Sequence, residues 1–469
     1  MSVEGRADVV VVGAGMSGLC ASVAALERGA RVVTVEKGTR FGGSMALSGG
    51  AMWTYVDKDR LREHIPDGNQ LLQSIVVDTL SDGHDWLERH GVPMTPERDI
   101  EQQGRGRSAD PSEMTATLVE RVRALGGQLL LNTPLDTLLY EGGAVRGISA
   151  FGPDGQTTFE ADAVVLAAGG FQGNPELVMR YITPNISRMY LRSNPWSTGD
   201  SFLAATELGA AVSPGLDCFY GHAIAAPPAV FSPDEFLDLS QKYGTITVAL
   251  NLDGSRFTDE SAGSGEEVLN QAVARQRDAT AFYVLDSELM EMSPPQGTLP
   301  RVAIERLRSH GGTVVESDTL EGLCRRLEEH GVHGKRAIST LHEFNAAILE
   351  ERAEELFPER REYRFPLVSP PFTAVPVRSG ITFSNGGLEV DAEMRVLRRS
   401  TTISNLPNVV ARATELKFDV IPGLFAAGCD VGNINHGGYM GGLAPALVTG
   451  RIAGYSAADL VKSARITVH

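Results

Sequence analysis

The segment ADVVVVGAGMSGLCASVAALERGARVVTVEK, residues 7–37, restricts the fold of this chain more than any other. The run Val9–Val12 does not alternate with polar residues, which indicates a strand covered on both faces, as in a parallel sheet. Gly13, Gly15 and Gly18 follow with the spacing G-x-G-x-x-G. In a strand–turn–helix unit these glycines permit a tight turn, let the backbone approach a pyrophosphate and let the helix pack closely. The segment therefore predicts a Rossmann-like α/β domain.

The residues after the glycines support a role in nucleotide binding. A helical pattern ends at Gly29, and a second buried strand ends at Glu36, 23 residues after Gly13. The start of the helix offers unpaired N–H groups to phosphates, and an acid at this distance accepts hydrogen bonds from ribose hydroxyls. The alternative is a glycine turn in an α/β protein without a ligand. The strand, helix and acid together favour dinucleotide binding.

The stretch FGGSMALSGGAMW, residues 41–53, favours FAD over NAD. Its uncharged, glycine-rich backbone is suited to lie along an extended cofactor, with Gly42, Gly43 and Ser44 at the pyrophosphate and 48–50 beside the isoalloxazine ring. The alternative is a flexible surface loop. That alternative does not explain the apolar residues of the stretch, which indicate a buried loop whose backbone needs hydrogen-bond partners.

Two later segments also combine a buried strand with the glycine-rich residues that follow it. Residues 161–177 read as a buried strand followed by Ala167-Ala168-Gly169-Gly170. Residues 421–460 read as a short strand, Gly428-Cys429-Asp430, a glycine-rich loop and a long helix of small residues. We expect Asp430 to hold the ribityl hydroxyls. The helix that begins near Gly442-Leu443 would direct its positive end at the pyrimidine edge of the flavin, where it would stabilise the reduced anion.

Composition and charge limit the partners and the compartment. The net charge of −17 argues against nucleic acid or an anionic membrane as the main partner. No apolar run approaches the roughly 18 to 20 residues of a membrane helix, and the buried strand starts too early for a signal peptide. The four cysteines show neither zinc spacing nor a disulfide framework. We therefore expect a cytoplasmic protein without a metal site.

The landmarks taken together resemble a known family, the flavoproteins of the fumarate reductase and succinate dehydrogenase type. The family includes 3-ketosteroid dehydrogenases and tricarballylate dehydrogenases. The matching segments, in order, are VVVVGAGMSGLCAS, FGGSMALSGGAMW, VVLAAGGFQGN, STGD, LNLDGSRFTDE, SGITFSNGGLEVDAEMRVL and LFAAGCDVGNINHGGYMGG. The ending SGG-x-x-W is most similar to the ketosteroid dehydrogenase branch.

The resemblance implies an FAD-binding domain of the glutathione reductase type with an inserted α+β cap domain. We place the FAD domain at 1–221 and 384–469 and the substrate cap at 222–383. Proline pairs punctuate the cap region, and residues 319–332 and 338–357 read as amphipathic helices. The substrate would lie between cap and flavin, at a domain interface.

Departures from the family pattern indicate the substrate. Ser264, Phe383 and Tyr439 stand where fumarate reductases have an arginine, a histidine and a second arginine. A site without those groups is poorly suited to a dicarboxylate. Tyr439 resembles the ketosteroid dehydrogenases, where such a group hydrogen-bonds the ketone. The resemblance implies dehydrogenation of a CH–CH bond beside a ketone, alicyclic or steroid-like, by α-proton abstraction and hydride transfer to flavin N5.

The catalytic base is left open among several residues. The ketosteroid enzymes use a tyrosine soon after the R-F-x-x-E motif, and this chain has none there. The candidates are His222, Tyr220, His436 and the pair 266–267. Each histidine has a structural role as its alternative, and an exposed helix start is the favoured reading of Glu266 and Glu267. Histidine titrates near neutrality, which suits a base.

The remaining expectations concern the cofactor and its partners. The first glycine-rich loop holds no histidine, so the FAD should be non-covalent. A second G-x-G-x-x-G, a haem motif and an iron–sulfur cysteine cluster are all absent from the sequence. An external electron acceptor or donor is therefore expected. Reduction of an enone or unsaturated carboxylic acid is the alternative function, and a non-catalytic flavin-binding protein is the second.

The site residues expected from the sequence fall into three groups. The catalytic candidates are Tyr439, His222, His436 and Tyr220. The cofactor-binding candidates are Gly13, Ala14, Gly15, Ser17, Gly18, Glu36, Lys37, Gly42, Gly43, Ser44, Ser48, Gly49, Gly50, Ala168, Gly169, Asn174, Asp200, Gly428, Asp430, Gly442 and Leu443. The substrate-binding candidates are Trp53, Phe383, Ser264 and Gly441.

Overall fold

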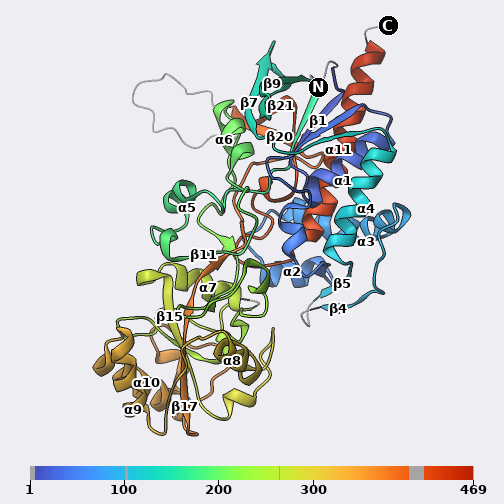
Figure 1. Cartoon of the computed structure of the whole chain (residues 1–469). Helices are drawn as coiled ribbons and strands as arrows, with labels where there is room; N and C mark the ends of the chain where they lie inside the picture. Colours follow the sequence, from blue (N-terminus) through green and yellow to red (C-terminus); the bar gives the residue numbers. More distant parts are fainter. Residues whose placement is uncertain (1–5, 101–103, 264, 401–416, 468–469) are drawn as a thin grey trace.

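A parallel sheet forms the centre of the upper lobe in Figure 1. The computed structural model describes residues 6–100, 104–263, 265–400 and 417–467. In this part of the chain the sheet has six strands in the order β20-β21-β10-β1-β2-β6. Their bounds are β1 Val9–Val12, β2 Val32–Val35, β6 Gln128–Leu130, β10 Ala163–Leu166, β20 Arg395–Ser400 and β21 Lys417–Ala426. All neighbours are parallel except β20 and β21, which are antiparallel.

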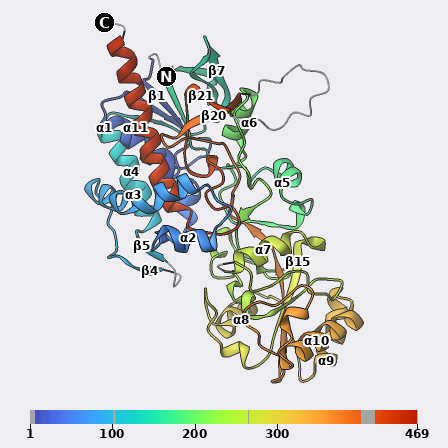
Figure 2. The ribbon, with the colours of Figure 1, turned by 180° about the vertical axis from the view of Figure 1, so that it is seen from behind.

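The sheet joins two pieces of chain that are far apart in sequence. Helix α1, Met16–Glu27, lies beside α11, Leu443–Thr467, in both views (Figures 1 and 2). The two helices approach closely because Gly450 and Gly454 face the backbone of Ser17 and Ala21, where a Cβ would lie 2.4 and 2.2 Å from the carbonyl oxygens. The C-terminal segment is therefore part of the same domain as the N-terminal one.

Smaller elements surround this sheet. A three-stranded sheet holds β3, Ala51–Tyr55, β5, Gly104–Ser108, and β4, Arg98–Ile100, in that order. A second three-stranded sheet holds β7, Leu135–Glu141, β8, Ala144–Gly152, and β9, Gly155–Glu160. The helices of this lobe are α2 Lys58–His64, α3 Gln70–Arg89, α4 Pro111–Ala124, α5 Pro175–Tyr181 and α6 Asp200–Glu207.

The lower lobe has its own sheet and its own hydrophobic core. The sheet runs β13-β17-β15-β14, with β16 also paired to β17. The strands are β13 Ile224–Ala225, β14 Val248–Leu250, β15 Thr280–Leu285, β16 Val315–Ser317 and β17 Phe372–Arg378, and the helices are α7 Glu266–Ala274, α8 Pro300–Ser309, α9 Leu320–Leu327 and α10 Gly334–Leu349. The buried apolar residues of this core lie between Ala223 and Val377. Their span agrees with the cap proposed at 222–383, although those boundaries stay a prediction.

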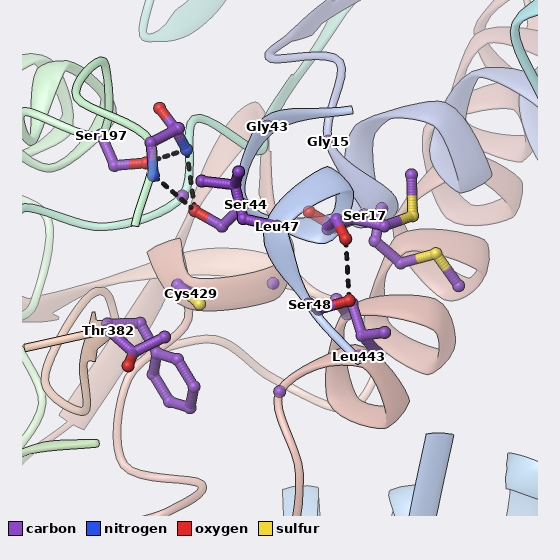
Figure 3. A pocket seen from close by; sticks show the side chains of 18 of the residues that line it. Gly15, Ser17, Gly43, Ser44, Leu47, Ser48, Ser197, Thr382, Cys429 and Leu443 are labelled. Atoms are coloured by element: carbon purple, nitrogen blue, oxygen red, sulfur yellow. Dashed lines mark hydrogen bonds between the residues drawn. The ribbon is translucent and has the colours of Figure 1, made fainter. Parts of the chain in front are cut away.

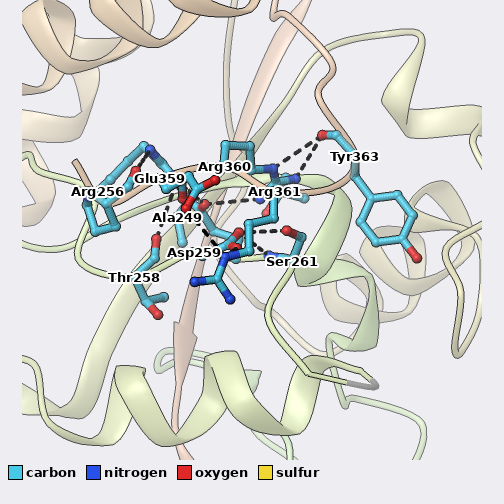
Figure 4. Close-up of polar contacts among 12 residues, drawn as sticks. Ala249, Arg256, Thr258, Asp259, Ser261, Glu359, Arg360, Arg361 and Tyr363 are labelled. Carbon is cyan, nitrogen blue, oxygen red and sulfur yellow. Dashed lines mark hydrogen bonds and ion pairs between the residues drawn. The ribbon is translucent and has the colours of Figure 1, made fainter. Parts of the chain in front are cut away.

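A buried ion cluster holds part of the cap together (Figure 4). Glu260 is fully buried and accepts hydrogen bonds from Arg256 at 2.6 and 2.9 Å and from Arg360 at 3.0 Å. Arg360 also donates to the backbone carbonyl oxygens of Thr245 and Tyr363. One carboxylate thus fixes two arginines that lie about one hundred positions apart.

Two short strand pairs join the lobes. β11, Tyr190–Leu191, pairs with β18, Gly380–Ile381, and β12, Phe219–Tyr220, pairs with β19, Phe383–Ser384. These pairs place residues just outside and just inside the cap beside each other. The cavity described below opens at this junction.

The sequence-based fold class is confirmed: an α/β FAD-binding fold with an inserted cap. β1 and α11 begin where the patterns predicted, at Val9 and Leu443, whereas α1 begins at Met16, three residues before the helical pattern that starts at Leu19. The 41–53 stretch, expected as a loop, instead contains a 3-10 helix at Gly43–Leu47 and the start of β3. Among the described residues, no helix combines the length and the apolar composition needed to cross a membrane.

Candidate active site

One long cavity runs from the nucleotide-binding glycines to the junction with the cap. Figure 3 shows its wall, with Gly15, Ser17 and Ser44 from the N-terminal piece, Thr382 from the junction and Cys429 and Leu443 from the C-terminal piece. The predicted residues that line it are Gly13, Gly15, Ser17, Glu36, Lys37, Gly43, Ser44, Ser48, Gly49, Gly50, Trp53, Ala168, Gly169, Asp200, Tyr220, Phe383, Gly428, Tyr439, Gly442 and Leu443. The structure thus brings together segments from both ends of the chain.

The glycines of the cavity wall have two different physical roles. A Cβ on Gly13 would lie 2.2 Å from the carbonyl oxygen of Ala167, and one on Gly18 would lie 1.9 Å from that of Gly13. These two glycines are required by contacts within the protein. Gly15 and Gly49 face space instead: a Cβ on Gly15 has its nearest neighbour at 3.8 Å, and one on Gly49 has none within 4 Å. Their missing side chains leave room along the cavity for a ligand.

Acidic and basic groups are fixed at the nucleotide end. Glu36 is buried and its carboxylate accepts hydrogen bonds from the backbone N–H groups of Ala14 at 2.8 Å and Gly38 at 2.7 Å. Lys37 pairs with Asp200 at 2.9 Å. These contacts hold the turn after β1 and the end of β2 at the cavity wall, where the sequence placed them.

A polar network that the sequence did not reveal continues along the wall. Ser44 contacts Ser193 at 2.7 Å and accepts a hydrogen bond from Asn194 at 2.8 Å. Asn194 also donates to Ser197, and Gln172 donates to Ser193, both at 3.1 Å. Asn194, Ser197 and Gln172 line the cavity. Ser197 opens the STGD segment and Gln172 lies in VVLAAGGFQGN, but no motif in the sequence marked Ser193 or Asn194.

Two residues expected to contact the cofactor have other partners. The carboxylate of Asp430 is buried and accepts hydrogen bonds from the N–H groups of Ala168 at 2.5 Å and Gly170 at 3.0 Å. Burial raises the pKa of this carboxyl. Asp430 thus stabilises the 168–170 turn and lies outside the cavity lining, so its oxygens are not directed at ribityl hydroxyls. Asn174 caps α5 by accepting hydrogen bonds from Glu176 and Leu177.

Several other candidates lie outside the cavity lining. Ala14, Gly18, Gly42 and Gly441 belong to the same turns but do not form its surface. His436 lies away from the lining and contacts the side chain of Asn433 at 3.1 Å, which agrees with its structural alternative. Ser264 lies outside the described residues.

Aromatic side chains form the end of the cavity nearest the cap. The rings of Tyr220 and Tyr439 stack with centroids 3.8 Å apart and an interplanar angle of 6°. Phe383 lies 5.0 Å from Tyr220, and Trp53 lies 5.8 Å from Tyr439, both measured between ring centroids. β12, β19, β3 and the loop before α11 each contribute one of these rings. Aromatic rings, two of them phenols, therefore form part of the cavity wall at this end.

A chain of polar contacts leads from Tyr220 into the protein interior. The Tyr220 hydroxyl lies 3.1 Å from His222 Nε2, and His222 Nδ1 lies 2.9 Å from Glu266. Tyr283 donates a hydrogen bond of 2.5 Å to Glu266. Burial lowers the pKa of His222 and raises that of Glu266, so the interior favours the neutral form of both groups.

The expectation of an exposed helix start at 266–267 is therefore wrong. Glu266 and Glu267 are 0% and 1% exposed. In the structure α7 packs under Tyr220 and against β15, which buries its first turn.

Two cations at this end were missed by the sequence analysis. Arg192 and Lys242 line the cavity, and Arg192 is only 2% exposed. Arg192 donates to Thr382 at 2.9 Å and to Ser240 at 3.2 Å. No sequence motif marked either residue, because the groups that surround Arg192 come from distant segments. The expectation that the site is poorly suited to a dicarboxylate did not take these two cations into account.

Comparison with known proteins identifies the fold and its cofactor. A family model described as FAD binding domain matches residues 8–443. The chain belongs to the FAD binding domain family. It is 27% identical over 482 residues to a probable fumarate reductase of Shewanella frigidimarina, an alignment that covers 96% of this chain and 74% of that protein.

Other members of the FAD binding domain family act on steroids. The chain is 24% identical over 585 residues to a 3-oxosteroid 1-dehydrogenase of Mycolicibacterium smegmatis, with 98% of each covered. The crystal structure of 3-ketosteroid delta1-dehydrogenase from Sterolibacterium denitrificans, in complex with 1,4-androstadiene-3,17-dione, is 19% identical. It has a TM-score of 0.72 and covers 97% of this chain and 99% of that one. That likeness confirms the fold.

The residues at the cavity fit FAD. Gly15 and Gly49 leave room along the wall, and Glu36, Ser44 and Asn194 offer polar atoms beside it. The chain is therefore an FAD-dependent oxidoreductase of the class that acts on CH–CH groups.

Proposed function

We propose that the protein dehydrogenates a CH–CH bond next to a carbonyl group of an alicyclic substrate. The observation that carries this proposal is the stacked pair Tyr220 and Tyr439, of which Tyr220 leads through His222 to Glu266. The pair lies in the cavity wall where the cap meets the FAD domain, which is the usual place for a small-molecule site.

Tyr439 is the proposed electrophilic group. A phenol that donates a hydrogen bond to a carbonyl oxygen stabilises the negative charge that develops there when the adjacent carbon loses a proton. Its ring is held between Trp53 and Tyr220, and Tyr55 donates a hydrogen bond of 3.2 Å to its backbone carbonyl. These contacts fix the orientation of the phenol before substrate binds.

Tyr220 is the proposed proton acceptor. It can take the α-proton as its own hydroxyl proton passes to Nε2 of the neutral His222 ring, whose Nδ1–H is held by a hydrogen bond to Glu266. Burial raises the pKa of Glu266, so the neutral carboxyl group accepts the Nδ1 hydrogen bond and orients the imidazole without taking its proton. His222 and Glu266 act through Tyr220 and do not contact the substrate.

The electron balance requires the cofactor and an outside partner. Bound FAD supplies the two-electron acceptor for the hydride that leaves the neighbouring carbon as the C=C bond forms. We propose that an external electron acceptor, of unassigned identity, then removes these electrons. The protein's residues contribute proton transfer, orientation and the exclusion of water.

Reduction of an enone or an unsaturated carboxylic acid is the second candidate. The same phenols would serve in reverse, with Tyr220 giving the proton to the α-carbon. Arg192 and Lys242 in the cavity wall favour an acid as the substrate of such a reaction.

The test is anaerobic titration of the flavin absorbance with saturated cyclic ketones, ketosteroids and carboxylic acids. A saturated ketone should bleach the flavin, and Tyr439→Phe should slow the bleaching by about 100-fold, the scale of one lost oxyanion donor. Tyr181→Phe is the matched control, since Tyr181 packs against Phe171 and Phe202 away from the cavity. Reoxidation of dye-reduced enzyme by an enone or unsaturated acid alone would establish the second candidate. A yellow protein that reacts with none of these would contradict both.

A further inference from the structure

We propose that Arg192 binds a carboxylate of the substrate, so that the substrate class is a cyclic ketone that also bears an acid group. This inference rests on the proposed function for the ketone part alone. The acid part follows from the environment of Arg192, and it assigns a binding residue that neither the sequence motifs nor the comparisons indicated.

The side chain of Arg192 is built into the cavity wall. Its Cδ lies 2.5 Å from the position that a Cβ on Gly380 would take. The absence of a side chain at Gly380 therefore makes room for Arg192. One terminal nitrogen donates to Thr382 and the other to Ser240, and the guanidinium lies 4.8 Å from the ring centre of Phe236. These contacts orient the group without neutralising its charge.

The charge of Arg192 has no acidic partner in the described part of the chain. The described ion pairs do not include Arg192, and its buried Nε lacks any hydrogen-bond partner. Glu266 is the carboxyl group that acts on it electrostatically, and burial raises the pKa of Glu266 toward the neutral form. A buried guanidinium without a counter-ion is costly, so a ligand anion is the missing partner.

The surrounding cavity is positive at this end. Lys242 also lines it, and the acids among the described lining residues, Glu36 and Asp200, lie at the nucleotide end. The positive field reaches His222: after burial, Lys242 and Arg192 are the causes that lower its pKa. Two cationic side chains therefore line the end of the cavity that also holds the phenols.

The space beside Arg192 defines the rest of the ligand. The rings of Tyr220, Tyr439, Phe383 and Phe236 form apolar walls, which suit a hydrocarbon ring. The phenols need an uncharged carbonyl oxygen, and Arg192 acts electrostatically on both of them, so the two polar groups of the ligand are close together. A six-membered ring with a ketone and a carboxylate meets these requirements.

The first experiment compares binding to the oxidised holoenzyme through perturbation of the flavin spectrum. The probes are 3- and 4-oxocyclohexanecarboxylate, their methyl esters and cyclohexanone. A free acid should bind at least about 30-fold more tightly than its methyl ester, the scale of a hydrogen bond to a charged group. Equal binding of every acid and its ester would overturn the anion subsite.

The second experiment assigns the preference to Arg192. In Arg192→Gln the ratio of the affinity for the acid to the affinity for its ester should fall toward one. Arg192→Lys should retain part of the preference for the acid. Arg188→Gln is the control, because Arg188 lies on the surface and pairs with Asp278. An unchanged ratio in Arg192→Gln, with loss of a tyrosinate absorption band, would mean that Arg192 serves a phenolate instead. If Arg192→Gln does not fold, the ratio in Arg192→Lys and in wild type decides the question.

The two proposals fail in different ways. Acid-selective binding without flavin bleaching by any keto acid or ester would support the anion subsite and contradict the proposed dehydrogenation. Bleaching by keto esters with no acid preference would support the dehydrogenation and contradict the anion subsite.

Discussion

At the scale of single residues, Gly49 offers a direct test of where FAD lies. It lines the cavity, and a Cβ there would meet no protein atom within 4 Å. Gly49→Ala should therefore leave the stability of the apoprotein unchanged while the methyl group occupies space that the cofactor needs. We expect FAD affinity to fall by at least about tenfold, or roughly 1.4 kcal/mol. Fluorescence titration of the apoprotein with FAD measures this.

A second glycine separates this effect from a general cost of substitution. Gly152 likewise has room for a Cβ, whose nearest protein atoms would lie 3.8 Å away. It lies at the end of β8, outside the cavity lining. Gly152→Ala should bind FAD as the wild type does. If Gly49→Ala binds equally well, the 48–50 segment is not beside the cofactor.

The same scale shows which residues sequence could not assign. Arg192 meets Thr382, 190 positions away, and Ser240, 48 positions away, so its burial results from docking of the cap and not from any local pattern. Asp430 stands in the expected motif, yet it is bonded to backbone N–H groups from 168–170. A motif predicts the backbone position of a residue, whereas long-range packing determines which groups its polar side-chain atoms contact.

At the scale of elements, local patterns predict what local forces decide. β1 starts at the expected residue, and α1 follows within a few residues of its predicted place, because a valine run and a glycine turn determine backbone geometry locally. The start of α7 agrees with the predicted helix start, but its predicted exposure is wrong. Glu266 is buried because it contacts Tyr283 on β15 and His222, which follows β12. Exposure depends on tertiary packing and is therefore the less predictable property.

The ion cluster of the cap yields a prediction at this scale (Figure 4). Glu260→Gln would leave the buried charges of Arg256 and Arg360 without their carboxylate. The free energy of unfolding of the cap should fall by about 3–5 kcal/mol, as for other broken buried pairs. Urea denaturation followed by circular dichroism measures the change. Glu355→Gln, which removes an exposed partner of Arg352, should have no measurable effect.

The contribution of Glu260 should also depend on pH. Burial alone would raise the pKa of Glu260, but the hydrogen bonds and charges of Arg256 and Arg360 lower it below its ordinary value of 4.5. The unfolded chain therefore binds this proton first as the pH falls. The stabilisation is complete above about pH 4.5 and is lost as the pH falls through the lowered value. Wild-type cap stability should decline over that range more steeply than that of Glu260→Gln, and parallel curves would contradict this account.

At the scale of the whole molecule, two hydrophobic cores meet at one ligand cavity. The first core includes β1, β10, β21 and α11, so that both ends of the chain contribute to the domain that holds FAD. The second lies within the cap. A ligand that binds only the folded state stabilises the domain that contacts it, by about 2.7 kcal/mol at one hundred times its dissociation constant.

Removal of FAD should therefore act unequally on the two cores. Calorimetry of holoprotein and apoprotein should show two transitions, of which the one for the FAD domain falls by roughly 4 °C without cofactor, because the entropy of unfolding is about 2.1 cal/mol/K per residue over a domain of about 300 residues. Glu260→Gln should lower the other transition, because its contacts lie in the cap. A single transition that responds equally to FAD removal and to Glu260→Gln would show that the junction strands β11–β18 and β12–β19 couple the lobes into one cooperative unit. In that case substrate bound at the junction would stabilise the whole chain, since both lobes would unfold with it.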